Sequence, residues 1–306
     1  MERWLGIILS CALSMACLAC GTMGARPSTI SSDAFEQRRV IVFTVYWDFS
    51  SAKNLLATPI VIYNNGHFRE PPCTHDEPEA AEFIQKYLTR GRSLLVLRGG
   101  RVIGATKITA SALPVKDSCS GMVVPVETSV EIENTIGEWR QEVLAITDLP
   151  PEKQGSSPQP ASKLLAEEAK RVVRNSLLGN GAPEKDVNKM KTEAWTADLN
   201  ADGTVDLIVT SKAYFEELIN EGDFYSVFLI AQKKEDSYEP VFVEYRRTSS
   251  EQESQFCSTH FIDTLNLSLS FPVSQVFVQY RCYEGVAYGV YDADGTRRYS
   301  GAYYGL

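Results

Sequence analysis

Histidine is scarce in this chain of 306 residues, and its three copies, His67, His75 and His260, are far apart. No pair has the short helical spacing of zinc ligands. The sequence also lacks a Gly-x-Ser-x-Gly nucleophile elbow. The segment 98–101, Arg-Gly-Gly-Arg, lacks the lysine and the following helix of a phosphate-binding loop. These absences leave zinc, serine-hydrolase and nucleotide chemistry without support, and we predict no catalytic residues.

Positive charge is also in short supply. Lys and Arg number 30 against 39 Asp and Glu, so the formal net charge is −9, and no long basic run occurs. Nucleic-acid-binding proteins carry basic faces, so we expect no nucleic-acid partner. Beyond residue 20 no apolar run approaches the ~18 residues of a membrane span, so we expect no membrane helix there.

The first 20 residues have the pattern of a targeting segment. Arg3 precedes an apolar stretch from Leu5 to Leu18, followed by small residues and cysteine. This pattern resembles a bacterial lipoprotein signal, which implies a membrane-anchored protein of the cell envelope, on its periplasmic or extracellular face. The resemblance makes Cys20 the lipidated residue, with Cys17 as the alternative. An ordinary cleaved signal and a short uncleaved anchor are the other interpretations, and residues 21–35 are expected to form a flexible tether.

Cysteine usage favours export. Seven cysteines are present, and four remain once residues 1–19 are removed and Cys20 is lipidated: Cys73, Cys119, Cys257 and Cys282. An even set in an oxidising compartment predicts disulfides. Three connectivities are possible, and we predict pairing within each half, Cys73–Cys119 and Cys257–Cys282. The alternative is four buried thiols.

A Pro- and Ser-rich stretch, residues 150–161, is the clearest linker. Before it, residues 36–149 contain β-branched strand patterns and one amphipathic helix pattern that ends near Gly91. After it, residues 162–306 begin with a helix capped by Ser162 and continue mostly as strands. We therefore predict an α+β fold, mostly antiparallel β, with two small domains, each a sheet with one main helix.

The segment 198–206 concentrates oxygen ligands. They occupy its positions 1, 3, 5 and 9: Asp198, Asn200, Asp202 and Asp206. Calcium is a hard cation that takes about 6–8 oxygen ligands, and the carbonyl of Thr204 could supply another. Gly203 permits a tight reversal of the chain. We predict one structural calcium site; the alternative is an Asx-rich turn whose side chains bond their own backbone.

The position of the site in the chain distinguishes it from an EF-hand. Position 12 is Val209 in place of a bidentate Glu, and residues 207–209 favour a strand over a helix. The pattern Asp-x-Asn-x-Asp-Gly-x-x-Asp before an apolar strand resembles the loops of FG-GAP and VCBS-type repeats. The resemblance implies a calcium ion that tethers adjacent strands, in an FG-GAP-like domain over residues 162–306, and it implies no reaction.

These features together predict an exported, lipid-anchored, non-catalytic envelope or surface protein. It would act by binding a protein or envelope partner, or structurally. The alternative is an envelope-polymer hydrolase or inhibitor that uses a cleft between the domains, for which a His–Ser pair or convergent carboxylates would be the sign.

Overall fold

The computed structural model describes residues 39–47, 54–72, 77–112, 122–132, 142–148, 157–212, 223–248, 257–267, 273–282 and 285–305. All strand pairs within these ranges are antiparallel. The prediction of a mostly antiparallel β fold is therefore confirmed. In the described part of the chain, no helix is both long and apolar enough to cross a membrane.

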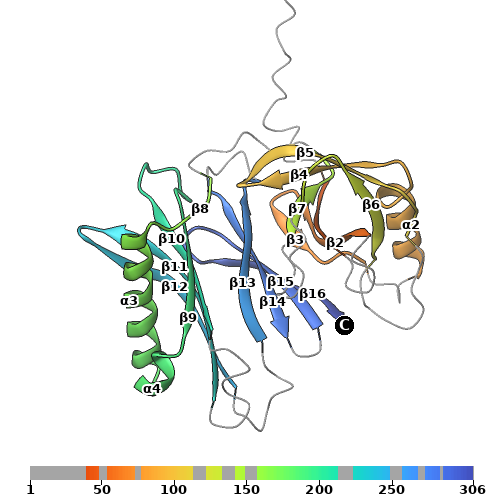
Figure 1. Ribbon diagram of the computed structural model, residues 1–306. Helices are drawn as coiled ribbons and strands as arrows, with labels where there is room; N and C mark the ends of the chain where they lie inside the picture. The colour runs from red at the N-terminus through yellow and green to blue at the C-terminus, as the bar shows by residue number, and fades with distance from the viewer. Residues whose placement is uncertain are drawn as a thin grey trace, which may run out of the picture. The chain divides into compact units, whose positions relative to one another are not determined.

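The first group of strands closes into a barrel (Figure 1). The strands are β1 (Arg39–Trp47), β2 (Leu55–Asn64), β3 (His67–Arg69), β4 (Ser93–Arg98), β5 (Arg101–Ile108), β6 (Val124–Thr128) and β7 (Val143–Ile146). Their order is β1-β7-β4-β5-β6-β2-β3, and β1 also pairs with β2, which closes a ring of six. The antiparallel sheet predicted for residues 36–149 is thus closed into a ring, and only the short β3 lies outside it.

The barrel interior follows from the alternation of side chains along each strand. On β1, Ile41, Phe43 and Val45 belong to one apolar cluster, which includes residues from all six strands of the ring. Helix α2 (Glu77–Tyr87) contributes Ala80 and Phe83 to the same cluster, so the helix covers the barrel interior.

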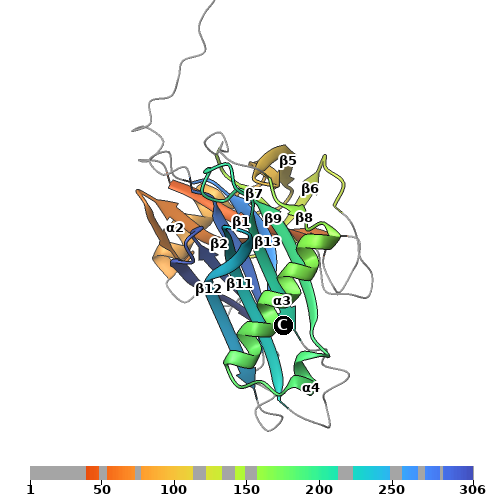
Figure 2. The ribbon, with the colours of Figure 1, turned by 90° about the vertical axis from the view of Figure 1, so that its left-hand side faces the viewer.

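Residues after 157 build a second sheet with a helix on one face. It has the order β12-β11-β10-β9-β8 and consists of β8 (Gln159–Pro160), β9 (Lys191–Ala197), β10 (Asp206–Lys212), β11 (Phe224–Lys234) and β12 (Ser237–Thr248). Helix α3 (Lys163–Gly179) lies along it, followed by the short α4 (Glu184–Val187) (Figure 2). β8 lies inside the stretch that was predicted to be a linker. Its residues Gln159 and Pro160 pair with β9, and β8 is the edge strand of the sheet, a position at which proline is tolerated.

The α3 helix behaves as its sequence predicts. Ser162 caps it, with its hydroxyl accepting a hydrogen bond from the Leu165 amide at 3.4 Å. Its inner face is the predicted one and includes Ala169, Val172 and Leu177. These side chains pack in one cluster with apolar side chains of β10 and β11.

A third sheet has the order β13-β14-β15-β16, formed by β13 (Cys257–Leu265), β14 (Gln275–Cys282), β15 (Gly285–Tyr291) and β16 (Arg297–Gly305). One face of it, including Val276 and Val278, shares a core with Ile208 and Phe228 of the helix-covered sheet. The two sheets therefore pack face to face.

The opposite face of the third sheet packs on the barrel. Phe277 and Tyr288 share a cluster with Val40, Val42 and Leu144, and residues Ser32–Leu306 form one compact unit. The predicted division into two domains, each a sheet with one main helix, is not confirmed: the second half has two sheets, and its core continues into the barrel. The alternation of apolar and polar residues in the sequence predicts the strands, but it does not show which faces of the sheets pack together.

Candidate functional site

The oxygen-rich segment forms the connection between β9 and β10. Ala197 pairs with Asp206, so the residues between them are a hairpin loop. Ala201 and Gly203 have positive φ angles of 58° and 85°, a conformation that glycine adopts without strain. The strand predicted after the loop is present as β10.

The acidic side chains of this loop bind its own backbone. Asp198 accepts hydrogen bonds from the amides of Asp202 and Gly203, both at 3.1 Å. Asp202 accepts from the Thr204 amide at 2.7 Å, and Asn200 donates to Asp202 at 2.8 Å. The side chains are thus arranged as in an Asx-rich turn.

Asp206 is the buried member of the loop, with 1% of its surface exposed. Its carboxylate accepts a hydrogen bond from the Leu199 amide at 2.9 Å. Burial raises its pKa to about 6, with smaller contributions in the same direction from the nearby carboxylates of Asp202 and Asp198 and an opposing one from the Leu199 bond. The donor set is hard and negatively charged, as calcium requires. However, no group of three or more His, Cys, Asp or Glu side chains in the described ranges is arranged to hold a metal ion.

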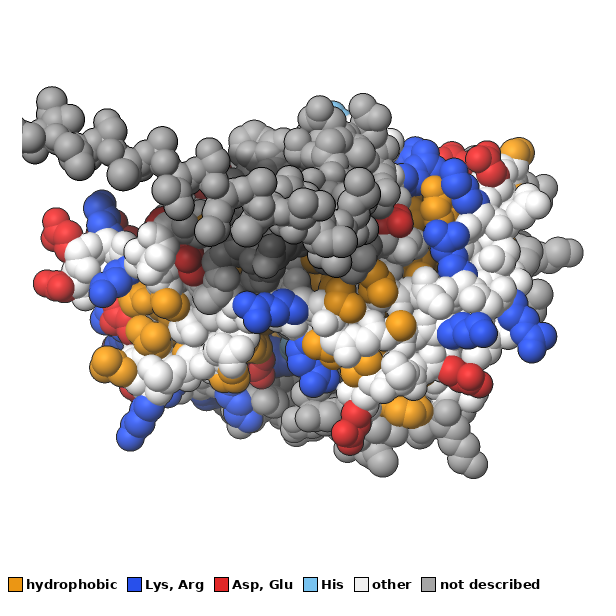
Figure 3. Space-filling view, turned by 90° about the horizontal axis from the view of Figure 1, so that it is seen from above, with side chains coloured by type: hydrophobic (Ala, Val, Ile, Leu, Met, Phe, Trp, Pro, Cys, Tyr) orange, Lys and Arg blue, Asp and Glu red, His pale blue; other side chains and the backbone are white. Residues whose placement is uncertain are grey.

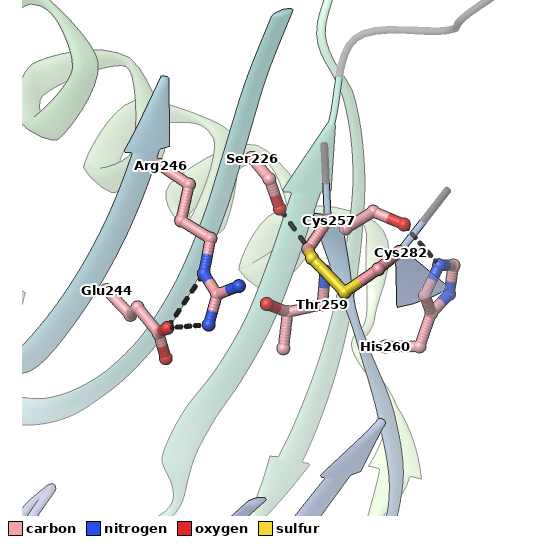
Figure 4. Close-up of a disulfide and its surroundings, with 8 residues drawn as sticks. Ser226, Glu244, Arg246, Cys257, Thr259, His260 and Cys282 are labelled. Carbon is pink, nitrogen blue, oxygen red and sulfur yellow. Dashed lines mark hydrogen bonds and ion pairs between the residues drawn. A yellow bond between two sulfur atoms is a disulfide. The ribbon is translucent and has the colours of Figure 1, made fainter. Parts of the chain in front are cut away.

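The predicted bridge between Cys257 and Cys282 is present. The two residues face each other across β13 and β14 and form a disulfide. Figure 4 shows the bridge between the Glu244–Arg246 pair on one side and His260 on the other. The other predicted site cysteines, Cys73 and Cys119, and the predicted lipid-bearing Cys20 lie outside the described residues.

A serine–histidine pair lies next to this disulfide. Ser258 and His260 are two residues apart on β13, so their side chains share a face. The Ser258 hydroxyl lies 3.0 Å from His260 Nε2, and Lys212 Nζ approaches the same nitrogen at 3.4 Å. Burial, together with the positive charges of Arg281 and Lys212, lowers the pKa of His260 to about 2. Sequence reasoning missed this pair, although the Ser-x-His spacing on one strand is a signal that could have indicated it. The approach of Lys212 carries no such signal, because β10 and β13 are far apart in the chain.

A second polar cluster lies between the two stacked sheets. Glu244 accepts hydrogen bonds from the hydroxyls of Tyr291, at 2.6 Å, and Tyr280, at 3.1 Å, and these two hydroxyls also contact each other. Arg246 donates to Glu244 at 2.9 Å and stacks 4.4 Å above the centre of the Tyr280 ring. Burial raises the pKa of both tyrosines. The residues come from three strands, and no local pattern in the sequence could have indicated the cluster.

Comparison of the chain with protein-family models, with curated proteins and with solved structures gives no match. The resemblances to lipoprotein signals and to FG-GAP and VCBS-type loops therefore stay interpretations of short segments.

Proposed function

We propose that this chain is an exported, lipid-anchored and non-catalytic protein of the cell envelope, which acts by binding a partner or structurally. The observation that carries the proposal is the disulfide between Cys257 and Cys282. Structural disulfides persist in oxidising compartments and are rare in the cytosol. The bridge supports the interpretation of residues 1–20 as an export signal.

The membrane anchor is tested at its attachment point. Cys20→Ser removes the thiol that would carry lipid, and Cys17→Ser is the matched control. We expect the Cys20 variant to leave the membrane fraction while the Cys17 variant stays in it. Retention of the Cys20→Ser protein in membranes would contradict the anchor, and release by Cys17→Ser alone would move it to that residue.

We further propose that the 198–206 loop holds one structural calcium ion. The support is the effect of two of its carboxylates on a third: Asp198 and Asp202 both raise the pKa of Asp206, so negative charge is concentrated in one bend. A cation would relieve this repulsion. Asp202 and Asp206 keep acceptor positions beyond the hydrogen bonds that they accept, because an ionised carboxyl group has about four lone-pair sites.

Calcium binding is tested by thermal unfolding. A ligand of the folded state adds stability as RT ln(1 + [L]/Kd), so calcium should raise the melting temperature and a chelator should reverse the rise. Asp202→Ala should abolish the shift. Asp294→Ala is the control, because Asp294 accepts from the Thr296 amide at 2.8 Å in a turn of the same kind. Equal melting temperatures in calcium and in chelator would remove the site.

One observation favours the alternative, a hydrolase of envelope polymers: the Ser258–His260 pair. Two features weigh against it. Ser258 is only 4% exposed, and an imidazole with a pKa of about 2 is a weak general base at neutral pH. Covalent labelling of Ser258 by a serine-directed phosphonate probe would reverse this judgement.

The charge distribution supports a partner other than nucleic acid. The net charge is −9, and Figure 3 shows Lys and Arg side chains interspersed with acidic and hydrophobic ones on the face it displays. Nucleic-acid-binding surfaces concentrate basic residues. A protein or envelope component is the partner we propose.

A further inference from the structure

Strand β12 is the outermost strand of the helix-covered sheet. Its neighbour is β11, and within the described residues no strand pairs with its other side. A strand at the edge of a sheet presents a row of N–H and C=O groups with which another strand can pair. β12 has 12 residues, Ser237–Thr248, about twice the usual length of a strand. It therefore offers a long edge to a second chain.

The backbone groups of Tyr238 show which residues of β12 face that edge. The Tyr238 N–H donates to the Glu168 carboxylate at 3.2 Å, and its C=O accepts from Arg171 at 3.5 Å. Both backbone groups are thus bonded to side chains of α3 and point away from β11. Tyr238 lies opposite Lys233 of β11, which gives the starting point for the rest of the strand.

The remaining outward groups follow by alternation along β11. Every second residue of β11, counted from Lys233, directs its backbone groups away from β12, and its partner on β12 faces the free edge. The extra residue of β12, Val241, lies at a bulge, and a bulge on one strand does not interrupt the count along the other. Among the described residues nothing bonds the outward backbone groups of three members of this set, which are Val243, Tyr245 and Arg247.

The beginning of the free edge is protected. Pro240 lies opposite Ala231, at one of the outward positions, and has no N–H to offer. The side chains of Glu168 and Arg171 occupy the backbone groups of Tyr238. Proline and covering side chains are common ways to prevent pairing at an edge strand. The part of β12 that is open to pairing is therefore residues 242–248.

The charges of the open part fit a second copy of the same segment. Two copies can pair antiparallel about a two-fold axis, with the same surface used on both. An axis at Glu244, Arg246 or Arg247 would oppose like charges, which destabilises a sheet, and one at Val243 would extend into the protected end. An axis at Tyr245 places Glu244 opposite the partner's Arg246, and the symmetry repeats this favourable pair. The outward groups of Val243 then face those of the partner's Arg247.

We propose that β12 pairs antiparallel with β12 of a second copy of this chain, with the two-fold axis at Tyr245. The two helix-covered sheets would join into one continuous sheet. Arg246 donates to Glu244 of its own strand at 2.9 Å, so the two copies bring together four charges of alternating sign. The pairing depends neither on the membrane anchor nor on calcium in the 198–206 loop.

A cysteine cross-link tests the register in the full chain. Tyr245→Cys places two thiols opposite each other at the axis, where the Cα atoms of a hydrogen-bonded pair are about 5.5 Å apart and a disulfide can form. Arg247→Cys is the matched control: its side chain is 57% exposed, but its two copies would be more than about 10 Å apart, too far for a disulfide. We expect a covalent dimer on a non-reducing gel for Tyr245→Cys alone. Dimers of both variants, or of neither, would overturn the proposal.

A second pair of variants tests the backbone bonds without a change at Tyr245. Arg247→Pro removes an outward N–H that would donate to the partner's Val243, whereas Arg247→Ala keeps it, and both lose the ion pair with Asp223. Sedimentation equilibrium of the chain carrying Cys20→Ser, which lacks the thiol for lipid, gives the dissociation constant of the dimer. Each dimer of the proline variant lacks two hydrogen bonds, so it should dissociate about tenfold more readily than the alanine variant.

The same measurement can contradict the pairing in two ways. If the edge serves an extended peptide of another protein, the parent chain stays monomeric at concentrations up to about 100 μM, and the proposal fails. Equal dissociation constants for the proline and alanine variants would show that the dimer forms through another surface.

Discussion

Tyr280 lies over Gly289 so closely that a Cβ on residue 289 would come within 2.7 Å of the Tyr280 hydroxyl oxygen. The missing side chain leaves room for the phenol to cross from β14 over β15. Its hydroxyl there meets Tyr291 and Glu244, which links β12 to the third sheet. The glycine on β15 therefore makes a buried contact between two sheets possible.

Gly289→Ala should destabilise the protein. The added methyl group forces the Tyr280 ring aside, and overpacking of this kind costs roughly 1–3 kcal/mol. Denaturant unfolding measures the change. Gly179→Ala is the control, because nothing lies within 4 Å of a Cβ at that residue and alanine favours helix there. Equal stabilities for the two variants would show that Tyr280 moves at no cost.

Tyr291→Phe should also destabilise the fold, by about 1–3 kcal/mol, because it leaves the partly buried Glu244 carboxylate with one donor fewer. Tyr245→Phe is its matched control. The Tyr245 hydroxyl is buried and has no hydrogen-bond partner in the described part of the chain, so its loss should be neutral or slightly stabilising. Urea unfolding of both variants distinguishes them, and a Tyr291 variant as stable as the parent would show that the network adds nothing.

The double variant Cys257→Ala/Cys282→Ala lacks the disulfide, and its free energy of unfolding should be about 3 kcal/mol lower than that of the parent. The two cysteines are 25 residues apart, and closing a loop of this length restricts the unfolded chain by about that free energy. Equilibrium unfolding provides the measurement. Alkylation followed by mass analysis of the parent should show both thiols protected until a reductant is added; reactive thiols in the untreated protein would contradict the bridge.

Acid should destabilise the protein through His260. Its pKa falls from 6.5 to about 2 on folding, so below pH 6.5 the unfolded state binds a proton that the folded state does not. The stability that His260 contributes to the folded state is therefore complete above pH 6.5, and it is lost as the pH falls toward 2. Between pH 6.5 and 4.5 the loss should reach about 2 kcal/mol.

The comparison with His260→Gln isolates this effect from that of the carboxylates. The variant should lose less stability than the parent over that pH interval, whereas His67→Gln, at an exposed position, should follow the parent. Parallel pH profiles for all three proteins would mean that the imidazole of His260 is protonated in the folded state.

The sequence by itself determined the local elements. The apolar face of α3, the β1 pattern, the turn at Asn65 and Gly66 and the hairpin loop before β10 all follow from periods of 3.6 or 2 and from turn residues. The Cys257–Cys282 pairing was also predictable, because the four cysteines beyond residue 20 allow only three connectivities.

Only the tertiary structure decided how these elements meet. Ring closure depends on Val42 pairing with Ile146, and the polar clusters depend on side chains such as Lys212 and His260 approaching from separate sheets. Strand periodicity assigns a residue to a face but contains no information on which distant face covers it. The chain therefore specifies its strands locally, and its barrel and its polar clusters arise only when those faces pack together.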